Sequence, residues 1–244
     1  MRCLLAFMTA TALAVAPAAA PAADQAKPLR TLVYTIVFSA ENRNVEQTSG
    51  FNGGGGGTGT AGGMVSRVSQ SGDSGTLTVN VVAATPDGGL VVDCAFAGTS
   101  TQQPVLRVAI FPDGRLAPPP NVTLSPAAAY LLPLLARGIV ADRSISPGDS
   151  WTRTALAPAK GTTTFRVTAL ADQDATLKID ATVSVPGPRG YDETDDGTAV
   201  YDTEKLAPVS YDLFATSRHI VAEQYITSNV RLTAKLVSDS FGAH

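Results

Sequence analysis

The chain has 244 residues, of which 16% are charged and 44% are hydrophobic, and its formal net charge at pH 7 is −3. This weakly acidic balance gives no electrostatic reason to bind nucleic acid or an anionic membrane surface. A chain of this length can bury a sizeable core without disulfides, and its many Thr, Val, Ala and Gly residues favour strands over helices.

The first 22 residues have the layout of a secretory signal peptide. Arg2 supplies a short positive start, residues 4–16 form an apolar core, and residues 17–23 are small. The core is too short for a stable membrane anchor, and we expect cleavage after Ala22. The sequence therefore predicts a secreted or periplasmic protein with an alanine-rich leader of bacterial type and no transmembrane segment in the mature chain.

Residues 23–244 are expected to form a single β-rich domain, interrupted by a flexible Gly-rich loop at residues 52–63. Alternating apolar and polar residues predict strands over residues 30–39, 65–71, 76–84, 90–97, 105–111, 151–156, 162–170, 175–185, 198–202, 209–217 and 219–237. The last segment is too long for an ordinary strand, so we expect a hairpin or bend near Ser228 and Asn229. The expected fold is mainly β: an antiparallel curved sheet, sandwich or open barrel of about ten to twelve strands.

Two features of the strand pattern bear on chemistry. Cys94 is the only cysteine of the mature chain, and alternation places it beside Val92 and Phe96, which predicts a buried, inert thiol without a disulfide partner. Residues 72–75 (Gly-Asp-Ser-Gly) resemble the nucleophile sequence of trypsin-like proteases, but no histidine precedes them. We interpret them as a hairpin turn. An echo between residues 67–80 and 166–180 leaves a duplicated hairpin open.

One helix is expected, over residues 125–138. Ser125 is suited to cap it, Gly138 to end it, and Pro133 to kink or split it. Its residues are almost all apolar. The helix must therefore be buried against the sheet or cover something apolar.

Residues 192–197 (Asp-Glu-Thr-Asp-Asp-Gly) form the main acidic cluster. Carboxylates before a glycine turn suit calcium, which makes Asp192, Asp195 and Asp196 candidate metal ligands. A solvated acidic hairpin loop is the alternative interpretation. His219 has no nucleophile in its sequence context, so we assign no catalytic residue and no cofactor.

The order of elements carries a resemblance. Successive antiparallel strands and one apolar helix precede a turn at residues 146–151 (Ser-Pro-Gly-Asp-Ser-Trp), which opens the next strand. This arrangement resembles uncharacterised secreted bacterial proteins, whose organisation is similar to that of periplasmic lipoprotein carriers. The resemblance implies a curved sheet covered by helices, with an apolar ligand between them.

Three functions remain open. The first is a non-catalytic binder of an apolar or lipid-like ligand held between sheet and helix, with Tyr130, Leu131, Leu134, Leu135 and Trp151 as candidate ligand-binding residues. The second is a cell-envelope or extracellular module that binds a protein partner through its edge strands and glycine loop. The third is a hydrolase whose site the sequence does not reveal.

Overall fold

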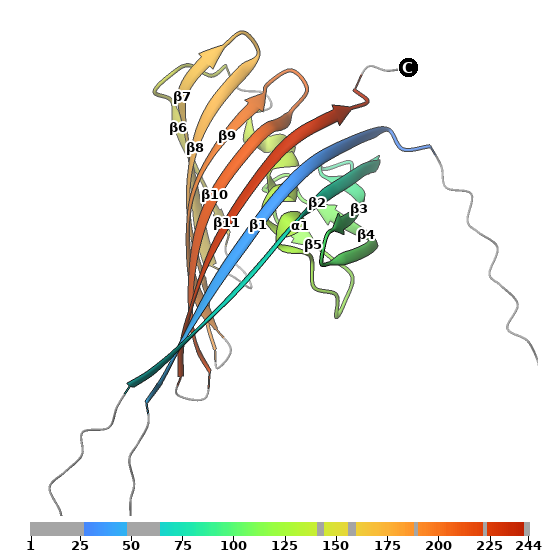
Figure 1. Ribbon diagram of the computed structural model, residues 1–244. Coiled ribbons are helices and arrows are strands. Elements are labelled where there is room, and N and C mark those ends of the chain that lie inside the picture. The colour runs from blue at the N-terminus through green and yellow to red at the C-terminus, as the bar shows by residue number, and fades with distance from the viewer. Residues whose placement is uncertain are drawn as a thin grey trace, which may run out of the picture.

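The computed structural model describes residues 27–47, 64–140, 144–155, 160–187, 190–221 and 224–241. The expected signal peptide and the Gly-rich segment 52–63 lie outside these residues. Within the described part, eleven strands form one antiparallel sheet, and Figure 1 shows this sheet curving around a short helical segment. The prediction of a mainly β fold with about this number of strands is confirmed.

The strands are β1 (Arg30–Gln47), β2 (Met64–Ala84), β3 (Leu90–Gly98), β4 (Gln102–Ile110), β5 (Leu116–Ala117), β6 (Ser150–Ala155), β7 (Lys160–Ala171), β8 (Asp174–Val185), β9 (Tyr191–Asp202), β10 (Ala207–Val221) and β11 (Gln224–Asp239). Their order in the sheet is β5-β4-β3-β2-β1-β11-β10-β9-β8-β7-β6. The first and last strands therefore pair with each other in the middle of the sheet. At one end of this pair, Arg30 Nη2 contacts Asp239 Oδ2 at 2.6 Å.

The helical segment lies on one face of the sheet, which we call the inner face. It consists of α1 (Pro126–Leu131) and two 3₁₀ turns, η1 (Leu132–Leu135) and η2 (Arg137–Ile139). Ser125 caps α1, since its Oγ accepts from Ala128 N at 3.3 Å. Pro133 lies in η1, so the expected split of the helix at this proline is confirmed. Among the described residues, no helix has both the length and the apolar character needed to cross a membrane.

The core lies between this segment and the inner face. Leu131, Leu132 and Ile139 are fully buried there. Cys94 is also fully buried, which confirms its predicted position, and burial raises the pKa of its thiol to about 11. Period-2 alternation explains which residues enter the core: in β8, Leu177 and Ile179 are buried, whereas Asp180 is exposed on the outer face.

Residues 72–75 are not a hairpin turn, and that prediction is wrong. They lie inside β2, where they pair with residues 36–39 of β1. The Asp73 carboxylate instead holds the turn between β3 and β4: it accepts from Thr99 Oγ1 at 2.7 Å, Ser100 N at 3.0 Å and Thr101 N at 2.8 Å. These hydrogen bonds, that of Thr99 above all, hold the pKa of Asp73 well below its usual range.

The hypothesis of a duplicated hairpin is wrong for the same reason. Residues 67–80 form part of the single strand β2, whereas residues 166–180 form a true hairpin between β7 and β8. The similar sequences reflect a shared strand pattern and not a shared topology.

The connection between β10 and β11 comes earlier in the chain than the predicted hairpin or bend. β10 continues to Val221 and β11 begins at Gln224. Ser228 and Asn229, where we predicted the hairpin or bend, lie inside β11 and pair with Ser217 and Thr216 of β10. A polar pair can occupy a strand interior here because its backbone groups are satisfied by neighbours on both sides.

Two core tyrosines have unsatisfied hydroxyls. Tyr34 and Tyr201 are fully buried, and within the described residues neither hydroxyl has a hydrogen-bond partner. We expect Tyr201→Phe to keep or raise the free energy of unfolding, by up to about 1 kcal/mol, because it removes a buried polar atom without breaking a bond. Urea denaturation measures this change, with Tyr130→Phe as a control that does remove a hydrogen bond. A loss above about 1 kcal/mol for Tyr201→Phe would contradict the prediction.

Candidate functional site

A groove of about 540 Å³ lies between the helical segment and the inner face of the sheet. Its volume falls within the range of about 300–1,000 Å³ typical of small-molecule sites. Its apolar lining includes Leu124, Pro126, Ala129, Pro133, Leu134, Phe165, Ile179, Ala181, Val183 and Val230. The groove therefore offers an apolar molecule a partly enclosed, largely apolar surface.

The roof of the groove comes from one flank of the helical segment. Ala129 and Tyr130 of α1 and Leu134 of η1 line it, whereas Leu131 and Leu135 face the core. The segment is apolar all round because both of its flanks contact apolar groups: one the packed core and the other the groove.

The loop after β4 lines the groove at its β6 end. Arg153 of β6 donates to the carbonyl oxygens of Pro112 and Asp113, both at 3.3 Å, and its guanidinium lies 5.3 Å from the centre of the Phe165 ring. Arg115 pairs with Asp113 at 2.5 Å. The two cations at this end are therefore already engaged with groups of the protein.

The part of the groove over β9 carries two carboxyl groups. Glu193 and Asp195 are two residues apart on β9, so both side chains point to the inner face, and both line the groove. Tyr130 donates its hydroxyl hydrogen to Glu193 Oε1 at 3.3 Å across the groove. The Asp195 Oδ1 atom is buried and has no hydrogen-bond partner in the described part of the chain.

Burial perturbs both carboxyl groups. Desolvation is the main cause that raises the pKa of Asp195 to about 7, and the charge of the neighbouring Glu193 and a hydrogen bond between the two carboxyl groups add to it. Desolvation also raises the pKa of Glu193, against the hydrogen bond from Tyr130. Perturbed carboxyl groups in a groove are typical of functional sites.

Gly197 leaves room in the floor of the groove for the ring of Tyr211, beside Glu193 and Asp195. A Cβ at Gly197 would lie 2.9 Å from Tyr211 Cε2 and 3.1 Å from its hydroxyl, so the ring of Tyr211 crosses β9 where no side chain stands. The glycine that we expected to form a turn is thus a strand glycine that permits close approach.

The predicted metal site is wrong. Residues 192–197 belong to β9 and not to a loop, and alternation sends Asp192 and Asp196 to the outer face but Asp195 to the inner face. Asp196 is exposed and forms an ion pair with Lys178. The three carboxylates cannot bind one ion, and the described residues contain no group of three or more His, Cys, Asp or Glu placed to hold a metal.

The candidate ligand-binding residues divide into three groups. Tyr130 and Leu134 line the groove, whereas Leu131 and Leu135 are buried in the core. Trp151 lies beside the groove, with its ring stacked on Phe165 at 5.6 Å between centroids. The sheet positions of the groove were not predicted: Glu193 was not singled out, and Asp195 was expected as a metal ligand. Strand alternation could have located Glu193 and Asp195, because they lie an even number of residues before the apolar Ala199 and Tyr201 and therefore on the same face of the strand.

Ser150 and His219 do not form a nucleophile–base pair. Ser150 begins β6, after a turn with Gly148 at φ +96°, and its hydroxyl donates to Phe165 O at 3.0 Å. His219 lies on β10, and three strands separate β10 from β6. The turn predicted before Trp151 is confirmed.

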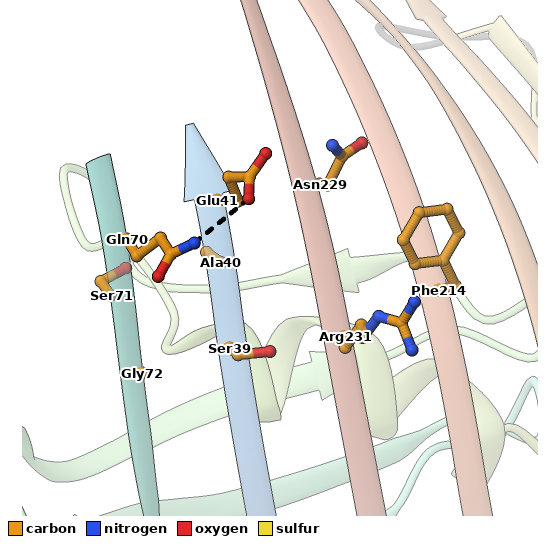
Figure 2. Close-up of a pocket in the computed structure, with 9 residues that line it drawn as sticks. All are labelled: Ser39, Ala40, Glu41, Gln70, Ser71, Gly72, Phe214, Asn229 and Arg231. Atoms are coloured by element: carbon orange, nitrogen blue, oxygen red, sulfur yellow. Dashed lines mark hydrogen bonds between the residues drawn. The ribbon is translucent and has the colours of Figure 1, made fainter. Parts of the chain in front are cut away.

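A second depression, of about 630 Å³, lies on the opposite, outer face (Figure 2). It crosses β2, β1, β11 and β10, and some of its lining side chains interact with one another. Gln70 donates to Glu41 at 3.2 Å, and the Arg231 guanidinium lies 5.3 Å from the centre of the Phe214 ring. It has no helical roof, so it offers an apolar molecule less cover than the groove on the inner face.

No model of a known protein family matches this chain, and a search of curated proteins finds no significant relative.

Proposed function

We propose that this protein is a non-catalytic secreted or periplasmic binder of an apolar or lipid-like ligand. The observation that supports it is the groove of about 540 Å³ between the helical segment and the inner face. Ligand binding there would rest on the burial of apolar surface against Leu134, Phe165 and Val183, with few polar contacts.

Native mass spectrometry of the mature protein purified from a bacterial periplasm tests this function. A bound apolar mass, released by solvent extraction, is the expected result. A clean apo mass, with no uptake of added fatty acids, phospholipids or alkylamines, would contradict it.

A tryptophan in the roof should block the groove. Ala129 lines it from α1, so we expect Ala129→Trp to fill part of its volume and weaken binding of an apolar probe by more than about tenfold. Titration with a fluorescent apolar dye measures the affinity. Ala171→Trp is the matched control, because Ala171 is exposed at the end of β7 away from the groove. Equal binding by both variants would show that the probe binds elsewhere.

The edge of β2 favours a second candidate function, an envelope or extracellular interaction module. The pairing of β2 with β3 begins at Gly75, opposite Gly98. From Met64 to Ser74, β2 therefore pairs with β1 on one side and with no described strand on the other. An unpaired edge of this kind can accept a strand from a partner. A ligand-free protein in the mass spectrometry experiment would favour this function.

A further inference from the structure

The carboxyl pair Glu193 and Asp195 has space beside it. On the inner face, the neighbours of Asp195 are Ala181 on β8 and Ala215 on β10, and those of Glu193 are Val183 and Ser217. Small side chains on both adjacent strands leave the carboxyl groups standing above the floor of the groove. A ligand in the groove would therefore meet the pair without displacing a large side chain.

The pair lacks a cation within the described part of the chain. None of the ion pairs there includes either residue. The titratable groups that face the pair are Tyr130 from α1, Tyr211 and His219 from β10, and Tyr191 from β9 itself. Tyr130 satisfies one oxygen of Glu193, while Asp195 Oδ1 has no donor. The cations at the β6 end, Arg115 and Arg153, are paired with Asp113 or with carbonyl groups.

We propose that Glu193 and Asp195 bind the ammonium group of an amphiphilic amine, whose apolar part occupies the groove. This inference rests on the proposed function and specifies the ligand's polar group. An ammonium supplies N–H donors to the unpartnered Asp195 Oδ1 and to the carboxyl group of Glu193 in charge-assisted hydrogen bonds, which are stronger than neutral ones. A carboxylate or phosphate at the same place would meet two like charges, which disfavours binding.

Isothermal titration calorimetry of the mature chain with decylamine and decanoate tests the ligand's charge. The two probes share one apolar chain and differ in the charge of the head group. Near pH 8 decylamine is protonated, as a lysine side chain is. We expect decylamine to bind at least about tenfold more tightly than decanoate.

Paired variants test the location. Glu193→Gln with Asp195→Asn should reduce the preference for the amine to less than about twofold, because the charge-assisted bonds are lost. The matched control is Asp192→Asn with Asp196→Asn, which removes the same charge from the same strand on the outer face. The control variant should keep the wild-type preference.

The outcomes separate this inference from the proposed function. Equal binding of both probes, or tighter binding of decanoate, to the wild-type protein overturns the amine specificity but leaves the apolar carrier intact. Failure of both probes, together with a clean apo mass, overturns both. A lost preference in the outer-face control overturns the assignment to Glu193 and Asp195.

Discussion

Replacing Asp195 by asparagine should raise the free energy of unfolding near pH 8 by about 2–4 kcal/mol and leave it nearly unchanged near pH 4. Burial first, and then the charge of Glu193, raise the pKa of this carboxyl from 3.8 to about 7. Near pH 8 the wild-type protein must hold an ionised carboxylate in a poorly solvated place, whereas asparagine has almost the same shape and stays neutral. Urea denaturation across this pH range measures the difference.

The pH dependence has a defined sign. Below pH 3.8 the folded and unfolded chains both hold the Asp195 proton, so its burial carries no charge penalty. As the pH rises from 3.8 to about 7, the unfolded chain releases the proton first, and the contribution of Asp195 to stability falls. Above about pH 7 both states are ionised and the loss is complete.

Asp196→Asn is the control for this prediction. Asp196 follows Asp195 in β9, but its side chain is 66% exposed on the outer face and pairs with Lys178. Exposed ion pairs contribute little, so we expect a change within about 0.5 kcal/mol at either pH. If Asp195→Asn brings no gain near pH 8, or if both variants behave alike, the carboxyl is not held in the environment described above.

Replacing Gly75 by alanine should lower the free energy of unfolding by about 3 kcal/mol. A Cβ there would lie 2.1 Å from Ala97 O and 2.5 Å from Gly98 Cα, both backbone atoms of β3. Backbone cannot rotate away as a side chain can, so β2 and β3 must separate at the point where their pairing begins. Urea denaturation measures the loss, and hydrogen exchange should show faster exchange at residues 98–101.

Gly72→Ala is the matched control in the same four-residue motif. Its Cβ would lie 3.2 Å from Phe38 O and 3.9 Å or more from the next atoms, those of Ser39, and Gly72 is exposed in β2. We expect a change within about 0.5 kcal/mol, because alanine loses less conformational entropy than glycine and the contact needs only a small shift. A similar loss for both variants would show that the cost arises from strand propensity and not from the approach of β3.

Local alternation predicted much of the sheet but not its connections. In β8 and around Cys94, each residue's face followed from its neighbours two positions away, and these assignments are confirmed. In β2, residues 72–75 have the composition of a tight turn. Only the pairing with residues 36–39 of β1, far away in the sequence, shows that they are part of a strand.

The candidate site was predicted only on its helical side. Tyr130 and Leu134 followed from an apolar helix that needed something to cover. Neither Glu193 nor Asp195 was predicted to line the groove, because five polar residues before a glycine are typical of a loop. Asp195 was predicted as a metal ligand instead. Extending the alternation of Ala199 and Tyr201 backward along the chain would have placed both acids on the inner face.

The sequence by itself determined that this protein is mainly β, that one apolar segment capped by Ser125 is helical, and which face of most strands is buried. These properties depend on residues within a few positions of one another. Only the tertiary structure decided that β1 pairs with β11, that Gly75 is a point of close approach, and that Glu193 and Asp195 meet Tyr130 across a groove. Such contacts join residues far apart in the chain, and they depend on strand pairing and on the curvature of the whole sheet.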